Sequence, residues 1–326
     1  MSKLHDLLLS ADYRTAPWFA VLDGAQFDNL PDALREGKFI ACSLYLDRGE
    51  NNPEQVITAP HLVVLDETAH NPALRPPAEA VPALLDLIKD RPAAVFWQCP
   101  KGEDALFKHL RGINMVMYPK ELLPPLDPEV EADSDEMTST EEAAETHARV
   151  LFRHADADVM AQVGSSLTMP NQARLLGPAS ALLFQASAER GGLLSVVMDA
   201  GVPAAPGPLR LSEAELSSLD GSNAALSRAR IETHLREVAP EYVDVVGSAG
   251  LSAVVQQAEQ TGGALGIETE YGQGLWATLM LMTGGELANE PQVVDYVKDH
   301  SEGPDRAVEE ILEQIGAASD EDWEAL

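Results

Sequence analysis

A series of short apolar runs, separated by stretches with helical spacing, constrains the fold of the first 120 residues more than any other feature. The runs are WFAVLDGA, ACSLYLD, HLVVLD, AAVFWQC and NMVMYP. Such runs are typical of strands that are buried on both faces. The intervening segments LPDALREG, AVPALLDLIKD and GEDALFKHLRG place their apolar residues at the spacing of amphipathic helices. This alternation predicts an α/β fold with a mixed, largely parallel sheet and flanking helices.

The composition changes after this region. Residues 121–148 contain 10 acidic residues and no lysine or arginine, so we expect a flexible acidic insertion that buries too little apolar surface to order itself. Three later runs, RVLFRHA, ALLFQAS and LLSVVMDA, predict further strands, and the last two are spaced as a hairpin. The sequence therefore predicts one α/β domain over residues 1–208, interrupted by the acidic insertion.

The remainder of the chain has a helical pattern. Ser212 and Glu215 have the spacing of a capping box, in which each side chain bonds a backbone N–H of the other residue at the start of a helix. The later stretch LWATLMLM is apolar on all sides and predicts a buried central helix. We therefore expect an all-helical lobe over residues 209–326.

The charge of the chain restricts its partners. There are 53 acidic and 22 basic residues, a net charge of −31, which repels nucleic-acid phosphates and anionic membrane surfaces. The excess is largest in residues 211–326, with 23 acidic and 5 basic residues. A basic partner and a saline environment both account for it. The N-terminal segment lacks the apolar run of a secretory signal, so the sequence predicts a soluble, cytoplasmic protein.

Most catalytic signatures are missing from the sequence. It contains no GxxxxGK[ST] phosphate loop, no GxGxxG after a strand, no HExxH, no GxSxG and no CxxC pair. These absences disfavour an NTPase, a dinucleotide oxidoreductase, a zinc protease and an α/β-hydrolase. We therefore expect no cofactor and no bound metal.

The stretch LFRHADADVM is the best remaining candidate for chemistry. His154, Asp156 and Asp158 alternate, and on an extended chain they would share a face, as the ligands of an open metal site do. Two structural interpretations compete with a metal site: an aspartate that caps the following helix, and a salt bridge to Arg153. Asp23, before Gly24, has the same ambiguity between a carboxylate at a sheet edge and a turn residue.

Several short motifs together resemble a known family. In order they are LDGA (22–25), SLY (43–45), APHLV (59–63), HLR (109–111), FRHADADV (152–159) and LLGP (175–178), followed by GIETEYGQGLWATLMLMTGGELANEP (266–291). The set is similar to the adaptor, or effector-chaperone, proteins of bacterial type VI secretion. The strand motif of that family is Phe-Arg, two variable positions, then Asp-Pro-Arg. Phe152, Arg153 and Asp156 match it, whereas Ala157 and Asp158 replace the proline and the second arginine.

The resemblance implies a function without catalysis. Such adaptors are cytoplasmic, bind a cognate toxic effector and load it onto the VgrG spike protein. Carried over motif by motif, it implies partner-binding roles for five residues: Arg153, Asp156, Asp23, Tyr45 and Arg111. The partners expected are thus an effector and VgrG, with no nucleic acid and no membrane. The alternative is a metal-dependent hydrolase that uses His154, Asp156 and Asp158.

Overall fold

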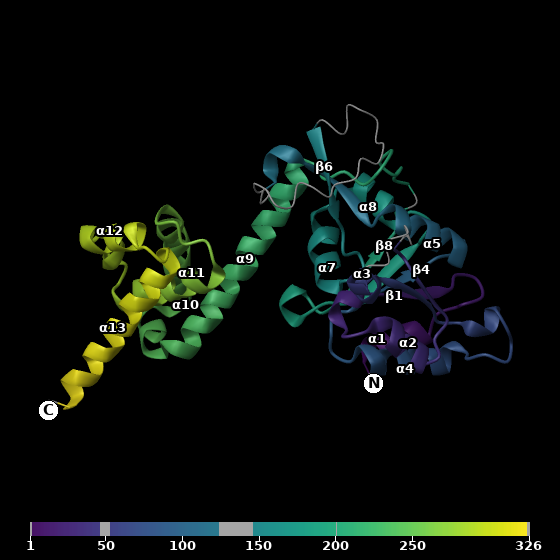
Figure 1. Ribbon diagram of the computed structural model, residues 1–326, viewed down its shortest axis with the longest axis horizontal. Helices are drawn as coiled ribbons and strands as arrows, with labels where there is room; N and C mark the ends of the chain where they lie inside the picture. The colour runs from purple at the N-terminus through teal and green to yellow at the C-terminus, as the bar shows by residue number, and fades with distance from the viewer. Residues whose placement is uncertain (1, 46–52, 124–145, 200, 325–326) are drawn as a thin grey trace. The chain divides into compact units, whose positions relative to one another are not determined.

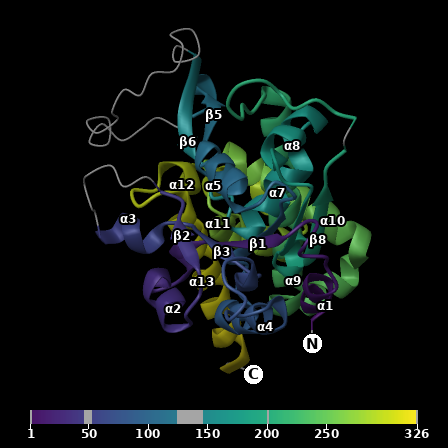
Figure 2. The same ribbon diagram turned by 90° about the vertical axis from the view of Figure 1, so that its right-hand side faces the viewer.

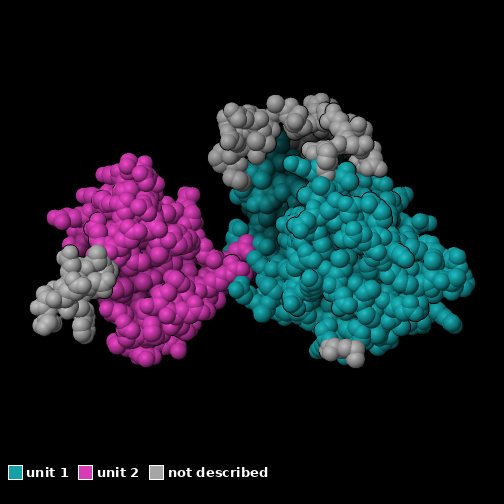
Figure 3. Space-filling model, turned by 60° about the horizontal axis from the view of Figure 1, so that its bottom comes forward, with its two compact units in different colours: residues 1–220 teal, residues 221–326 magenta. Residues whose placement is uncertain are grey.

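The structure is a computed structural model that describes residues 2–45, 53–123, 146–199 and 201–324 (Figure 1). Contacts divide the chain into two compact units, residues 1–220 and 221–326 (Figure 3). The division falls within helix α9 (Glu213–Val238), whereas the boundary predicted after residue 208 lies before this helix begins. Most of the predicted acidic insertion, residues 124–145, lies outside the described residues.

Unit 1 contains a six-stranded sheet in the order β2-β3-β1-β4-β7-β8. Its strands are β1 (Trp18–Leu22), β2 (Ala41–Ser43), β3 (His61–Val64), β4 (Ala94–Gln98), β7 (Ala181–Gln185) and β8 (Leu193–Val197). β5 (Met115–Pro119) and β6 (His147–Leu151) form a separate antiparallel pair. The predicted hairpin is confirmed, because β7 and β8 pair directly.

The sheet is antiparallel throughout, so the prediction of a largely parallel sheet was wrong. Helical segments do connect β1 to β2 and β3 to β4, and each connected pair runs in the same direction. However, β3 lies between β1 and β2, and β1 lies between β3 and β4. The strand–helix alternation of the sequence is therefore real, but its parallel strands are interleaved rather than adjacent.

Helices cover both faces of the sheet (Figure 2). One face packs against α1 (Lys3–Leu9), α2 (Leu30–Glu36) and α4 (Pro77–Ile88), and the other against α5 (Glu103–Gly112), α7 (Ala157–Ser166) and α8 (Met169–Leu176). Unit 1 also contains the short helices α3 (Pro53–Thr58), η1 (Gly24–Gln26), η2 (Glu67–Ala69), η3 (Lys120–Leu122) and η5 (Ala188–Arg190).

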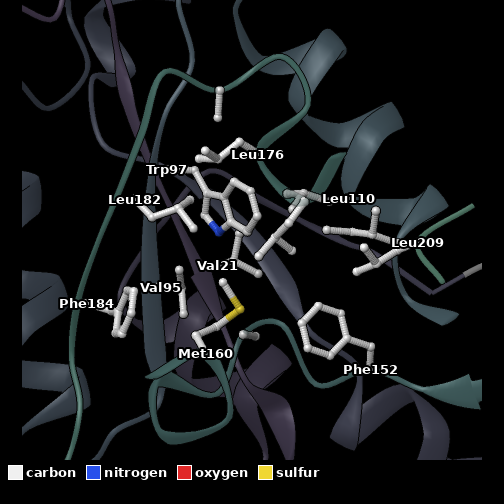
Figure 4. Close-up of a cluster of buried hydrophobic side chains, with 14 of the residues drawn as sticks. Val21, Val95, Trp97, Leu110, Phe152, Met160, Leu176, Leu182, Phe184 and Leu209 are labelled. Carbon is white, nitrogen blue, oxygen red and sulfur yellow. The ribbon is translucent and has the colours of Figure 1, made fainter. Parts of the chain in front are cut away.

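The two faces have separate cores, which explains the continuous apolar runs. Along β1, Val21 belongs to the core that includes Trp97, whereas Ala20 belongs to the opposite core with Phe96. Figure 4 shows Trp97 enclosed by apolar side chains from several elements, and its exposed fraction is 0%. Because burial on both faces occurs in parallel and antiparallel sheets alike, the runs do not determine strand direction.

Unit 2 is helical. After α9 it contains α10 (Pro240–Ala264), α11 (Glu270–Met282), η6 (Glu286–Asn289), α12 (Pro291–Asp299) and α13 (Pro304–Glu324). The predicted central helix is confirmed as α11, in which residues 276–281 are all buried against neighbouring helices. None of the helices in the described part of the chain combines the length and apolarity needed to cross a bilayer.

Candidate functional site around Arg153

Arg153 lies between two buried carboxylates, at the point where three elements of unit 1 end or begin. It follows β6; Asp23 follows β1, and Asp156 directly precedes α7. The Arg153 guanidinium donates a hydrogen bond to Asp23 and lies 3.3 Å from the Asp156 carboxylate. The side chain of Arg153 is 41% exposed, whereas those of Asp23 and Asp156 are 5% and 11% exposed. The cluster thus joins distant segments and leaves part of one cation accessible to solvent.

Both carboxylates also hold backbone N–H groups. Asp23 accepts a hydrogen bond from the amide of Ala25 at the start of η1. Asp156 accepts from the amides of Asp158 at 2.9 Å and Val159 at 3.2 Å, and so caps α7. Capping satisfies N–H groups that have no partner inside a helix. Of the interpretations left open by the sequence, the turn, the cap and the salt bridge are therefore all present here.

The charges in this cluster act on one another. Burial raises the pKa of Asp156, and the amide hydrogen bonds and Arg153 only partly oppose this. Burial alone would lower the pKa of Arg153, but its hydrogen bond to Asp23 and the two carboxylate charges outweigh burial and raise it. The pKa of Tyr45 is raised by burial and by the charge of Asp23. Tyr45 is therefore within electrostatic range of the same cluster.

His154 points away from Arg153 into the core. It is 1% exposed, and its Nε2 lies 2.7 Å from Asn114 Oδ1. The Asn114 amide nitrogen donates to the Leu44 carbonyl, which leaves the amide oxygen to accept from His154 Nε2–H. The ring packs edge-on against Trp97, and burial lowers the pKa of His154 to about 3. His154 is thus a neutral core residue.

Asp158 has a third and separate contact. Its carboxylate accepts a hydrogen bond of 2.7 Å from the Ser187 amide, just before η5. His154, Asp156 and Asp158 therefore do not converge as the hydrolase hypothesis requires. Among the residues that the structure describes, no group of three or more histidine, cysteine, aspartate or glutamate side chains could hold a metal ion.

Arg111 lies apart from the other predicted partner-binding residues. It is on α5, where its guanidinium carbon is 5.2 Å from the centre of the Phe107 ring. Its charge lowers the pKa of Cys42, although burial dominates and raises that pKa to about 11. The described residues show no contact between Arg111 and the Arg153 cluster. The structure therefore brings Arg153, Asp23 and Asp156 into contact, places Tyr45 within electrostatic range of them, and leaves Arg111 outside.

Residues from several of the sequence motifs meet in pairs. Asp23 of LDGA binds Arg153 of FRHADADV. A Cβ atom on Gly24 of the same motif would collide with the backbone of Ala59 in APHLV. His109 of HLR lies 2.7 Å from the Leu175 carbonyl of LLGP, and its ring occupies the space beside Gly177. Five of the motifs in unit 1 are therefore in contact, in two groups, rather than isolated signals.

Sequence reasoning did not identify Asn114 and Ser187, which fix His154 and Asp158. They lie 40 and 29 residues from their partners, and neither stands in a recognisable local pattern.

No family model matches the chain, and comparisons with curated proteins and with solved structures found no match either. The interpretation of the site therefore depends on its own geometry and on the motif resemblance.

Proposed function

We propose that the chain is a non-enzymatic, cytoplasmic adaptor that binds a cognate type VI secretion effector and loads it onto the VgrG spike. The observation that carries the proposal is the convergence of motif residues from distant segments on Arg153. Asp23 and Asp156 contact this arginine, and Tyr45, from a third motif, interacts with the same cluster through charge. This convergence supports the interpretation of the motifs as the signature of one domain, and with it the function that the resemblance implies.

The electrostatics favour protein binding. The guanidinium of Arg153 is partly exposed beside two carboxylates, so the cluster has a formal charge of −1 and an accessible cation. Residues 211–326, with 23 acidic and 5 basic residues, would attract a basic protein surface and accelerate its association. The net negative charge of both regions suits a basic protein surface and is unfavourable for nucleic acid.

One departure from the family motif narrows the proposal. Asp158 stands where the family has an arginine, and it accepts a hydrogen bond from the Ser187 amide. A contact made by an arginine at that position is therefore not part of the proposed site. We assign partner contact to Arg153, the only cation of this cluster among the described residues.

Affinity purification of the tagged full-length chain from its native cells tests the proposal. We expect an effector and VgrG, identified by mass spectrometry, to co-purify with the wild-type chain. Arg153→Ala should reduce effector recovery about tenfold or more, because a charge-assisted contact is worth about 1.5–3 kcal/mol. Arg35→Ala is the matched control, since Arg35 also pairs with an aspartate but its side chain is 75% exposed.

Arg153→Ala also leaves Asp23 and Asp156 without their cation, so we expect a loss of about 1–3 kcal/mol in stability, moderated by the exposure of the arginine. If the variant does not fold, Arg153→Lys keeps the charge but not the planar donor geometry. Should the wild-type chain purify without an effector or VgrG, the adaptor proposal is wrong. Equal recovery with Arg153→Lys, Arg153→Ala and wild type would remove Arg153 from the site.

A further inference from the structure

Strand β8 forms one edge of the six-stranded sheet and has unpaired backbone groups along its outer side. The Met198 amide donates to the Ser180 carbonyl at 2.9 Å, and the Ala186 amide donates to the Gly192 carbonyl at 2.8 Å. In this antiparallel register, residues 194 and 196 also bond to β7, so Leu193, Ser195 and Val197 direct their N–H and C=O groups outward. None of these outward groups has a partner among the described residues.

The same three residues face an apolar groove. Side chains alternate along a strand, so those of Leu193, Ser195 and Val197 lie on the α1 face of the sheet. A groove of about 350 Å³ is lined there by Leu7, Ala11, Trp18, Leu183, Leu193 and Val197, among others. Val197 is 72% exposed and Leu7 is 42% exposed. The unpaired backbone groups and the groove therefore lie side by side.

β8 lacks the features that normally protect a sheet edge. Its sequence, LLSVV, contains no charge and no proline. The opposite edge, β2, has only three residues and is therefore protected by its shortness. An uncharged five-residue edge beside an apolar groove is the arrangement to which extended peptides add as a further strand.

We propose that β8 takes up an extended, apolar segment of a partner protein as a seventh strand, with alternate side chains of that segment in the groove. Only another extended backbone can bond the outward groups of Leu193, Ser195 and Val197 in register. A second copy of the chain is a poor occupant, because two chains of net charge −31 repel each other. The edge is also about 17 Å long, too short to bury the roughly 1,600 Å² of a stable dimer.

The inference does not depend on the type VI assignment. A phage-displayed library of random peptides, selected against the full-length chain, supplies the probe. We expect selected peptides to alternate apolar residues and to bind Ser195→Pro about tenfold more weakly, through loss of an outward donor. Proline is tolerated there because the Ser195 N–H does not bond to β7. Val197→Lys should weaken binding through the groove, whereas Val245→Lys, at a residue 85% exposed in unit 2, should not.

Amide hydrogen exchange measured by NMR provides an independent readout. In the free chain the amides of residues 193, 195 and 197 should exchange faster than those of 194 and 196. A bound peptide should protect the odd-numbered amides. Binding that is unchanged in both Ser195→Pro and Val197→Lys, or protection confined to other elements, would overturn the proposal. Concentration-dependent dimerisation that protects the same amides would also overturn it, since the occupant would then be a second copy.

Discussion

The two units of the chain bury different kinds of side chain. Among the described residues, eight of the nine buried polar or charged side chains belong to unit 1. They are Asp23, His61, Glu67, His154, Asp156, Ser166, Asn171 and Glu215. The ninth is Thr278 in unit 2, whose hydroxyl donates a hydrogen bond to the Gly274 carbonyl of its own helix. The core of unit 2 is otherwise made by apolar residues on helices that follow one another in the chain.

This difference indicates which substitutions and conditions should change the stability of each unit most. In unit 1, polar contacts join segments far apart in sequence, such as Arg153 and Asp23, which are 130 residues apart. A buried polar group that loses its partner is costly, so unit 1 should respond strongly to charge and pH. Unit 2 should respond mainly to changes in core volume. The predictions that follow test this contrast, beginning with the largest expected effect.

Removing the central aromatic residue of unit 2 should have the largest effect. Trp276 is fully buried in α11, and its indole nitrogen donates to the Thr261 hydroxyl at 2.9 Å. Trp276→Ala should destabilise unit 2 by about 3–5 kcal/mol, because it leaves a cavity and removes the hydrogen bond to Thr261. Denaturant unfolding followed by hydrogen exchange should show α11 exchanging early while β4 of unit 1 stays protected. Tyr271→Ala, at a residue 62% exposed on the same helix, is the control.

The second largest effect should come from a buried carboxylate of unit 1. Glu215, 2% exposed, accepts hydrogen bonds from Ser212, Thr168 and Asn171. Glu215→Gln replaces one acceptor oxygen with a donor that faces other donors, so we expect a loss of about 2–3 kcal/mol. Chemical denaturation at neutral pH measures it. Glu213→Gln changes the same type of residue at an exposed position of α9 and should change stability little.

The pH dependence of Glu215 tests the same contact independently. Burial raises its pKa, but the hydrogen bonds from Ser212, Thr168 and Asn171 outweigh burial and lower it to about 2. The unfolded chain has the ordinary value of 4.5. This contribution to stability is therefore complete above pH 4.5 and is lost as the pH falls towards 2. If the stability of Glu215→Gln depends on pH in that window as strongly as the wild type, the assignment to Glu215 is wrong.

Local interactions around Glu215 could be predicted from the sequence, and distant ones could not. The Ser212–Glu215 capping box was predicted from spacing and is confirmed by hydrogen bonds in both directions. The bonds to Thr168 and Asn171 span 47 and 44 residues and depend on how α8 packs beside α9. Residue spacing predicts contacts within one turn of a helix, whereas contacts between residues far apart in sequence depend on the fold.

The sheet shows the same limit at larger scale. Each of the apolar runs became a strand, because length and side-chain type are local properties. Strand direction and order depend on which strand inserts between two others, and no residue within β1 or β3 records this. The sequence therefore predicted where the strands are but not how they are paired.

The candidate site failed as a metal cluster for a local reason. The argument for a shared face requires an extended chain from His154 to Asp158. The chain instead turns at His154 and Ala155, and Asp156 caps α7, so the three side chains bond different partners. The cap at Asp156 was a stated alternative, because an aspartate before a helix is a local signal. The pairing of Arg153 with Asp23 required the fold.

His154 provides the smallest and most selective test of the contrast. Its pKa is about 3 in the folded chain because of burial, against 6.5 for an ordinary histidine. His154 thus binds a proton less readily in the folded chain than in the unfolded chain. The stability that this residue contributes is complete above pH 6.5 and falls as the pH drops towards 3. Between pH 6.5 and 5 we expect a loss of about 1–2 kcal/mol, confined to unit 1.

Stability curves from pH 7 to 5 should therefore slope downward for wild type and more gently for His154→Gln. The slope, rather than the absolute stability, is the informative quantity, because the substitution also disturbs the packing against Trp97. Burial lowers the pKa of His61 and His109 as well, so some slope should remain in the variant. Equal slopes in wild type and His154→Gln would mean that His154 is hydrated and can be protonated in the folded chain. The pH dependence of His154 would then provide no evidence that unit 1 is more acid-sensitive than unit 2.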